Sequence, residues 1–388
     1  MSFSSRAASA GTLAAFVGSS SSFAIIIAGL IAVGASREEA ASGLMALSIA
    51  MGVCAMLLSY LRRMPISIAW STPGAALLAT GVAPEGGFAV AVGAFIVSGM
   101  LIVLSGVFKP LGRWVAAIPA PLANAMLAGV LLQLCLAPVK AVSDFPVIGL
   151  AIFTTWALVG LFNRVLAMPA AVIVAVAGIF FTRGEGTAEA ISLVPVLTFI
   201  APDFTLAGMI GIGVPLFIVT MASQNIPGMA VLHANGYRPD ANPLFSWTGA
   251  FSLLAAPFGG HAINLAAITA VLCANEDADP DPAKRWQAAF VAGAWYIVFG
   301  FVAGAATAFI GSSPPILIEA VAGLALLGAL GSSLSNALAD TTHREAAIVT
   351  FLTTASGVAF FGVSGAFWGV LAGGALMALQ RLRSTANG

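Results

Sequence analysis

Apolar runs of the length that crosses a lipid bilayer fill most of this 388-residue chain. Hydrophobic residues make up 60% of the sequence and charged residues only 8%, and the mean hydropathy is +1.03. These values lie far outside the range of soluble domains. We therefore expect an all-α integral membrane protein.

A membrane helix needs roughly 20 apolar residues, and by this criterion we expect about fourteen membrane-spanning segments. Their approximate boundaries are 12–35, 40–60, 66–81, 87–108, 115–137, 146–162, 165–182, 205–233, 243–259, 261–274, 287–310, 315–338, 345–361 and 363–380. The third and tenth segments are too short to cross as plain helices. We expect each to be part extended chain and part half helix, which is tolerated at membrane depth only where protein or a watery cavity satisfies the backbone.

Basic residues are distributed unequally between the two sides that this topology predicts. Twelve of the fifteen Lys and Arg residues fall on the side of the N-terminus, and three, Arg37, Lys140 and Arg183, fall on the other. Loops rich in Lys and Arg stay in the cytoplasm. We therefore expect both termini to be cytoplasmic. The balanced total charge gives no reason to expect a nucleic-acid partner.

Pro, Gly and polar residues interrupt the apolar sequence at two matching places, 66–78 and 256–267. Such interruptions in the two halves of a chain point to the substrate site of a transporter. The separation of Thr72 from Ala262 is nearly equal to that of Pro121 from Pro315, two prolines that precede long apolar runs, and both separations are close to half the chain. These similar offsets favour a duplication over chance placement of prolines.

The expected duplication divides the chain into two repeats, residues 1–185 and 205–388, joined by a linker at 186–204. Each repeat would hold seven segments. Because seven is odd, the second repeat would insert upside down relative to the first, so we expect an inverted repeat.

The tenth segment carries the most specific motif. Its sequence from Gly260 to Thr269 is similar to the Gly-Glu-Asn-Ile-Gly-x-x-Ala-Ile-Thr signature of nucleobase/proton symporters, and Val219 to Ile226 resembles the segment with their other substrate-binding acid. Gln224 and His261 stand where that branch has glutamates. With these replacements, the serine run 19–22 and the segment 68–74, the whole chain resembles the benzoate/proton symporter family.

This resemblance implies a proton-coupled secondary transporter that imports benzoate or a similar small aromatic carboxylate by alternating access. It also implies a core domain of segments within 12–108 and 205–310, and a gate domain of segments within 115–182 and 315–380. The expected location is a bacterial cytoplasmic (inner) membrane, and a homodimer is possible. A transporter of nucleobases, of other monocarboxylates or of other anions with the same fold remains an alternative.

Physical reasoning from the residues leads to a compatible substrate. Half helices beginning near Pro73 and His261 would direct two helix N-termini, each worth about half a positive charge, at one point, which suits a carboxylate. No Lys or Arg lies within an expected segment away from its ends, so neutral polar groups would hold the anion. The expected substrate-binding residues are Ser20, Ser21, Ser71, Thr72, Gly74, Gln224, Asn225, Gly260, His261 and Asn264. Serines in membrane helices can equally bond to the preceding turn.

Two residues are candidates for proton coupling. At a helix N-terminus, the positive potential would disfavour a charged His261, and an arriving carboxylate would favour proton uptake, which links the two binding events. The alternative for His261 is a neutral ring bonded to a backbone carbonyl. Glu319 is a carboxylate inside an expected span, and a buried acid there is a candidate proton relay or gate contact. The alternative for Glu319 is a position that faces water.

Other function classes find little support in the sequence. A nucleotide-binding Gly-x-x-x-x-Gly-Lys-Ser/Thr loop and the usual hydrolase motifs are missing, so neither ATP-driven transport by this chain alone nor an enzyme is expected. Three cysteines in apolar spans argue against disulfides or a zinc site, and we expect no metal and no cofactor. A small-anion channel is the remaining alternative, which would need a continuous polar pore.

Overall fold

The computed structural model describes residues 4–108, 119–182, 196–267, 269–311, 313–358 and 365–386. Apart from two strands of three residues, its regular structure is helical. In the first half of the chain the elements are α1 Ser5–Ala32, α2 Arg37–Arg62, β1 Ile68–Trp70, α3 Thr72–Ala79, α4 Phe88–Val107, α6 Ala120–Asp144, α7 Pro146–Phe162 and α8 Arg164–Thr182. In the second half they are α9 Leu206–Gly208, η1 Met209–Gly213, α10 Val214–Thr220, η2 Met221–Asn225, α11 Ile226–Ala234, α12 Ala241–Ala255, η3 Ala256–Phe258, β2 Ile263–Leu265, α13 Thr269–Ala274, α14 Trp286–Phe301, α15 Ala303–Gly311, α16 Pro315–Ala339, α17 Arg344–Ala355 and α18 Gly365–Ala386.

Several of these helices can cross a membrane. Among the described residues, six helical stretches are long and apolar enough, and α14 with α15 makes a seventh that is bent by 58°. Three shorter apolar helices lie at 146–162, 166–181 and 365–380. The structure therefore confirms a helical membrane protein with several spans, while the expected number of fourteen segments stays a prediction.

Helix starts follow local sequence signals. Ser36 and Glu39 form a reciprocal capping box at the start of α2, and Ser71 caps α3, whose second residue is Pro73.

The helices α6 and α16 correspond to each other in the two halves of the chain. Each begins next to two prolines, and the two helices are equal in length. α6 and α16 begin at positions 120 and 315, and β1 and β2 begin at positions 68 and 263, so one and the same offset separates the members of both pairs. This common offset is more regular than the offsets that the sequence suggested.

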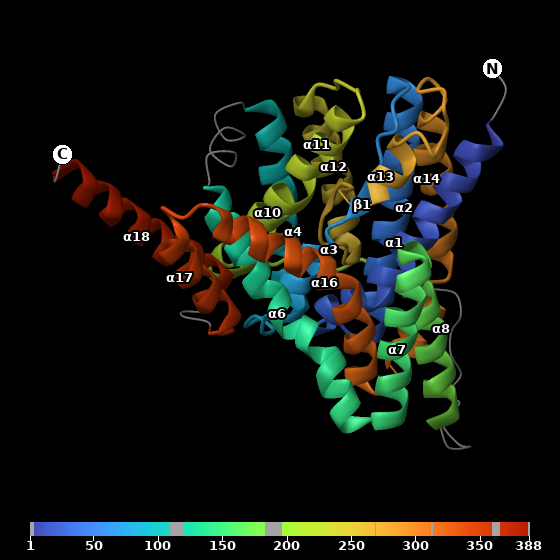
Figure 1. Ribbon diagram of the computed structural model, residues 1–388, viewed down its shortest axis with the longest axis horizontal. Coiled ribbons are helices and arrows are strands. Elements are labelled where there is room, and N and C mark those ends of the chain that lie inside the picture. Colours follow the sequence, from blue (N-terminus) through green and yellow to red (C-terminus); the bar gives the residue numbers. More distant parts are fainter. Residues whose placement is uncertain are drawn as a thin grey trace.

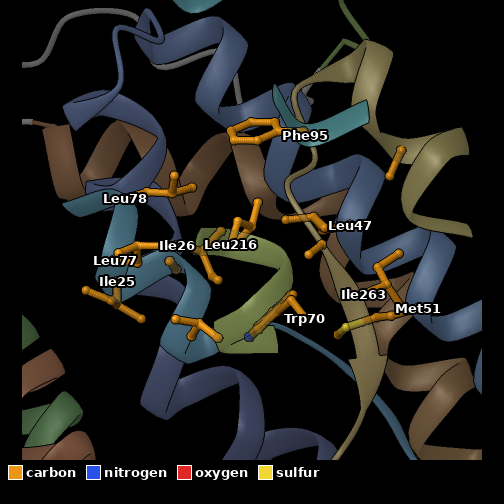
Figure 2. Packing of buried hydrophobic residues seen from close by; sticks show 14 of the residues in the cluster. Ile25, Ile26, Leu47, Met51, Trp70, Leu77, Leu78, Phe95, Leu216 and Ile263 are labelled. Atoms are coloured by element: carbon orange, nitrogen blue, oxygen red, sulfur yellow. The ribbon is translucent and has the colours of Figure 1, made fainter. Parts of the chain in front are cut away.

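The helices surround the two strands in an arrangement visible in Figure 1. α1, α2, α13 and α14 lie together on one side, and α6, α7, α8 and α16 form a second group, with α6 and α16 packed against each other. α17 and α18 extend away from the body at the C-terminal end of the chain. The larger apolar core encloses the strands and joins α1, α2, α3, α4 and α10, as Figure 2 shows for Ile25, Met51, Leu78, Phe95 and Leu216.

The expected linker is only partly described, because residues 183–195 lie outside the described residues. The following stretch, 196–204, is irregular chain. The Ile200 N–H donates to the Pro257 carbonyl at 2.8 Å, and the Asp203 N–H donates to the Ala89 carbonyl at 3.0 Å. This stretch is thus fixed to both halves of the chain.

Candidate functional site

The two broken segments meet in the interior of the molecule. β1 and β2 pair in antiparallel orientation, with Ile68 opposite Leu265 and Trp70 opposite Ile263. One further backbone bond extends the ladder at each end, from the Ser71 N–H to the Ala262 carbonyl and from the Ala266 N–H to the Ser67 carbonyl, both 2.9 Å. Pairing satisfies backbone groups that could find no partner in lipid. The expectation that the third and tenth segments combine extended chain with a short helix is confirmed.

The two short helices begin at different distances from the strand pair. α3 begins at Thr72 with Pro73 next, as expected from the sequence. α13 begins at Thr269, so the expected half helix starting near His261 is wrong. The residues after His261 continue as extended chain because they pair with β1. His261 therefore does not lie at a helix N-terminus, and the electrostatic argument based on that position does not apply.

A cavity lies beside the strand pair, and its empty volume, including the part open to solvent, is about 500 Å³. Residues of α1, α2, α3, η2, α13 and α14 contribute to its wall, together with the chain around the strands. The lining residues are Val17, Gly18, Ser22, Met51, Ala69, Trp70, Thr72, Gln224, Ala266, Ala267, Thr269 and Tyr296. Neither Lys nor Arg is among them. The cavity thus combines apolar surface with neutral polar groups.

Two aromatic rings form one part of the wall. The centroids of the Trp70 and Tyr296 rings are 6.4 Å apart, with the ring planes inclined at 48°. The Trp70 indole N–H donates to the Ser22 hydroxyl at 3.0 Å, and the side chains of Tyr296 and Thr269 both lie next to Gly18. The bond to Ser22 holds the Trp70 ring in place, and rigid aromatic walls of this kind suit a flat ring in a ligand.

Two of the expected substrate-binding residues, Thr72 and Gln224, line the cavity. Gln224 lies in the π-helical turn η2, and among the described residues its side-chain amide has no hydrogen-bond partner. Ser71, the residue before Thr72, is fully buried, and its hydroxyl accepts bonds from the Gly74 N–H at 3.1 Å and from the Thr220 hydroxyl at 2.8 Å. An added Cβ on Gly74 would lie 2.7 Å from that same Ser71 oxygen. Ser71 and Gly74 therefore shape α3, and neither is among the residues that line the cavity.

Three other expected residues brace the strand pair. The Asn225 side-chain oxygen accepts a bond from the Leu265 N–H at 2.9 Å, and its amide nitrogen lies 3.1 Å from the Met221 sulfur. Asn264 lies within β2 and donates to the Leu265 carbonyl at 2.8 Å. Gly260 packs so closely on α12 that an added Cβ would lie 2.8 Å from the Ala255 Cβ. None of these three lines the cavity.

His261 joins the two broken segments without reaching the cavity wall. Its Nε2 atom lies 3.0 Å from the Ser71 carbonyl oxygen, and its ring packs edge-on against Phe95 with centroids 6.3 Å apart. The residue is fully buried, and its Nδ1 atom has no partner among the described residues. Because a carbonyl only accepts, Nε2 carries a proton in this arrangement.

The remaining expected residues are not brought together with the cavity wall. The Ser20 hydroxyl donates back to the Val17 carbonyl at 3.2 Å, and Ser21 lies in α1 with a side chain outside those described. Glu319 lies near the start of α16, partly buried, where the charge of Lys140 on α6 acts on it. Among the described residues no group of three His, Cys, Asp or Glu could hold a metal ion.

Sequence reasoning did not select several residues of the wall, including Tyr296, Met51, Gly18 and Thr269. Thr269 ends the motif that begins at Gly260, but the motif alone does not mark it as a site residue. Tyr296 is one of only three tyrosines in the chain and lies within an expected span, which was a usable signal. Met51 and Gly18 resemble many other residues in apolar helices, so no sequence feature distinguishes them.

Comparison with solved structures shows which fold class this arrangement of helices and strands belongs to. The overall structure of SLC26A9 matches with a TM-score of 0.61 and 16% identity, covering 97% of this chain and 65% of that chain. The transmembrane domain of the cyanobacterium bicarbonate transporter BicA matches with a TM-score of 0.58 and 15% identity, covering 97% of this chain and 95% of that chain. The chain therefore has the fold of the SLC26 anion transporters.

The family follows from sequence. The model of the benzoate membrane transport protein family, BenE, matches residues 2–379, and the chain belongs to this family. The inner membrane protein YdcO of Escherichia coli (strain K12) is 41% identical over 385 residues, which cover 97% of this chain and 96% of the relative. The benzoate membrane transport protein of Acinetobacter baylyi is 35% identical over 341 residues, which cover 87% and 86%. The chain is thus a membrane transporter and not an enzyme.

Proposed function

We propose that this chain is a proton-coupled symporter that imports benzoate or a similar small aromatic carboxylate. The observation that carries the proposal is the cavity beside the strand pair, with its aromatic wall and its neutral polar groups. The name of the Acinetobacter baylyi relative, a benzoate membrane transport protein, agrees with this substrate.

The cavity suits the two ends of such a molecule. A benzene ring would lie against Trp70, Tyr296 and Met51. The carboxylate would accept bonds from the Thr72 and Thr269 hydroxyls and from the unpartnered amide of Gln224. Neutral donors bind an anion less tightly than Lys or Arg would, which helps a carrier to release it on the other side.

Alternating access would arise from an inverted repeat of seven plus seven segments. The equal offset between β1 and β2 and between α6 and α16 supports the duplication. The cavity-lining residues all fall within the ranges expected for the core domain, 12–108 and 205–310. This agrees with the proposed division into a core domain and a gate domain, the latter formed by 115–182 and 315–380. The gate would move against this core, as in other carriers built from inverted repeats.

His261 is the preferred proton site, with Glu319 as the other candidate. A proton added at His261 Nδ1 would place a positive charge beside Ser71, directly behind the cavity wall. A bound carboxylate would stabilise that charge, so the two ligands would bind cooperatively.

Replacing His261 by Gln should retain benzoate binding and abolish its pH dependence, while Glu319→Gln should leave that dependence intact. The reverse result would assign the proton to Glu319.

Uptake into proteoliposomes tests the proposed function. Radiolabelled benzoate should accumulate above equilibrium when the outside is acidic, and a protonophore should abolish the accumulation. Saturation with rising benzoate concentration would separate this carrier from a small-anion channel. Competition by benzoate, substituted benzoates, uracil and sulfate at two pH values identifies the substrate, and inhibition by uracil alone would overturn the aromatic carboxylate.

The proposed location is a bacterial inner membrane, which agrees with the name of the Escherichia coli relative, and both termini would be cytoplasmic. A homodimer is part of the proposal as well. Its mass in detergent, measured by light scattering coupled to size-exclusion chromatography, should correspond to two chains of 39.1 kDa. A mass of one chain would exclude the dimer under those conditions.

A further inference from the structure

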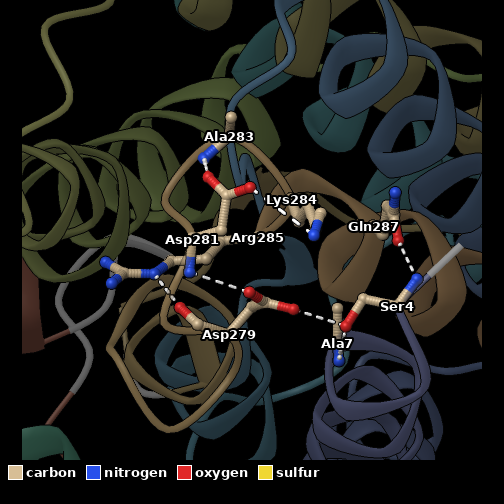
Figure 3. A network of polar contacts seen from close by, with 8 residues as sticks. All are labelled: Ser4, Ala7, Asp279, Asp281, Ala283, Lys284, Arg285 and Gln287. Atoms are coloured by element: carbon tan, nitrogen blue, oxygen red, sulfur yellow. Dashed lines mark hydrogen bonds and ion pairs between the residues drawn. The ribbon is translucent and has the colours of Figure 1, made fainter. Parts of the chain in front are cut away.

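A network of polar contacts at one end of the molecule involves the loop between α13 and α14, and Figure 3 shows its residues. The loop contains Asp279 and Arg285, which are only 6% and 4% exposed. Buried charged residues are rare unless they are paired or hydrogen-bonded. The cavity does not include any residue of this loop, so the binding site itself does not explain why both are buried.

Arg285 binds backbone carbonyl groups at the end of α13. Its Nη1 donates to the carbonyl of Ala274, the last residue of α13, at 3.0 Å, and its Nε donates to the Asp279 carbonyl at 2.6 Å. An arginine at a helix C-terminus satisfies carbonyl groups that lack partners and interacts favourably with the helix dipole. Arg285 therefore fixes the C-terminal end of α13 to the loop.

The loop is in turn attached to the N-terminal end of α1. The Ser4 hydroxyl donates to the Asp279 carboxylate, and the Ser4 N–H donates to the Gln287 side chain at 2.6 Å. The bond from Ser4 keeps the pKa of Asp279 below its usual range. The Tyr237 hydroxyl, from the turn between α11 and α12, donates to the Pro282 carbonyl at 2.8 Å. One loop thus joins the ends of α1, α11, α13 and α14.

α13 has only six residues, which is too short to be stable by its own hydrogen bonds. Its conformation must depend on what holds its two ends. At the N-terminal end, Thr269 lines the cavity together with Tyr296 of α14. At the C-terminal end, Arg285 holds Ala274. A displacement at either end of so short a helix is transmitted to the other.

We propose that Arg285 is a positioning residue for the substrate site: by holding the carbonyl end of α13, it keeps Thr269 in the cavity wall. Ser4 and Asp279 extend this anchor to α1, which supplies Val17, Gly18 and Ser22 to the same wall. The inference rests on the proposed function, because it takes the cavity as the substrate site.

A native thiol reports on α13 independently of transport. Cys273 lies in α13 and is 1% exposed, and replacing Cys54 and Cys135 by Ala leaves it as the only thiol of the chain. In this background, Arg285→Ala should free the end of α13 and raise the rate at which N-ethylmaleimide labels Cys273 by about tenfold, which corresponds to about 1.4 kcal/mol. Ser4→Ala, which removes one contact further away, should have a smaller effect in the same direction.

Transport measurements test the effect on the site. The benzoate concentration for half-maximal uptake should rise about tenfold in Arg285→Ala, with a much smaller change in the maximal rate. Arg285→Lys keeps the charge but cannot span two carbonyl groups, so its half-saturation concentration should be intermediate. If Arg285→Ala elutes as aggregate, Arg285→Lys is measured in its place. Lys284→Ala is the matched control, since this partly exposed neighbour pairs only with Asp281, at 3.6 Å, in the described contacts.

Several results would overturn the proposal. Equal labelling of Cys273 in the background, in the Arg285 variants and in Lys284→Ala would show that Arg285 does not hold α13. Faster labelling with an unchanged half-saturation concentration would show that α13 does not position the site. If the background protein itself transports no benzoate, the proposed function fails, and the labelling rates still decide whether Arg285 anchors α13.

Discussion

At the scale of single residues, Tyr296 contributes both an aromatic ring and a hydroxyl to the cavity wall. Replacing Tyr296 by Phe keeps the aromatic surface and removes a hydrogen-bond donor from the wall. The half-saturation concentration for benzoate should rise about threefold to tenfold, as expected for the loss of one hydrogen bond. Tyr60→Phe is a matched control, because Tyr60 is 50% exposed and far along α2 from the cavity-lining Met51. An unchanged value in Tyr296→Phe would exclude a role for the hydroxyl.

Gly18 sets the width of the cavity. An added Cβ would lie 3.2 Å from both the Tyr296 hydroxyl and the Thr269 methyl group, closer than these atoms pack without moving. Gly18→Ala should therefore weaken benzoate binding at least about fivefold, and more for ring-substituted benzoates. Gly328→Ala, in α16 where an added Cβ meets no atom within 4 Å, should bind as the parent does. Isothermal titration calorimetry measures both, and equal loss for all benzoates would argue against a limit set by ring size.

At the scale of elements, the π-helical turn η2 directs two adjacent amide side chains to different partners. Gln224 faces the cavity, whereas Asn225 accepts the Leu265 N–H of β2. Asn225→Ala would leave this buried N–H without a partner, which costs about 1–3 kcal/mol. We expect a lower melting temperature in detergent without substrate. Asn124→Ala removes only an exposed bond within α6 and should not change it. Lost benzoate binding at an unchanged melting temperature would instead indicate direct contact with substrate.

The elements show where sequence patterns were informative. Pro73 and Ser71 predict the start of α3 because capping and Pro at the first turn are local effects. The start of α13 could not be located from local sequence, because the residues after His261 become extended only by pairing with β1, which lies in the other half of the chain. Asn225 and Asn264 both hydrogen-bond to the backbone of Leu265 in β2. The sequence marks these polar residues as candidates, but their hydrogen-bond partners depend on tertiary structure.

At the scale of the whole molecule, the unequal distribution of basic residues predicts the orientation. In a variant with all three cysteines replaced by Ala, Glu38→Cys in the exposed first turn of α2 should react with a membrane-impermeant maleimide added to intact cells. Arg238→Cys, between α11 and α12, should react only after the inner membrane is permeabilised. The opposite pattern would mean that the termini face outwards.

Composition and the resemblance to a family were enough to predict the class of molecule, because both depend on the whole chain. The described helices agree with a multi-pass membrane protein, and the family match confirms transport. The cavity wall was predicted only in part. Thr72 and Gln224 belong to recognisable motifs, while Val17, Met51 and Tyr296 lie outside any recognised motif and enter the wall through packing.

The antiparallel pairing of β1 with β2 has a consequence for biosynthesis. β1 ends at Trp70, and its hydrogen-bonding partner, which begins at Ile263, leaves the ribosome only after about half the chain has been added. At about 5–20 residues per second, that interval is on the order of 10–40 seconds. During this time the first half of the chain carries an open strand edge at membrane depth, where lipid offers no replacement partner. The nascent N-terminal half therefore depends on the insertion machinery, or on water within its own unfinished interior, until its second half arrives.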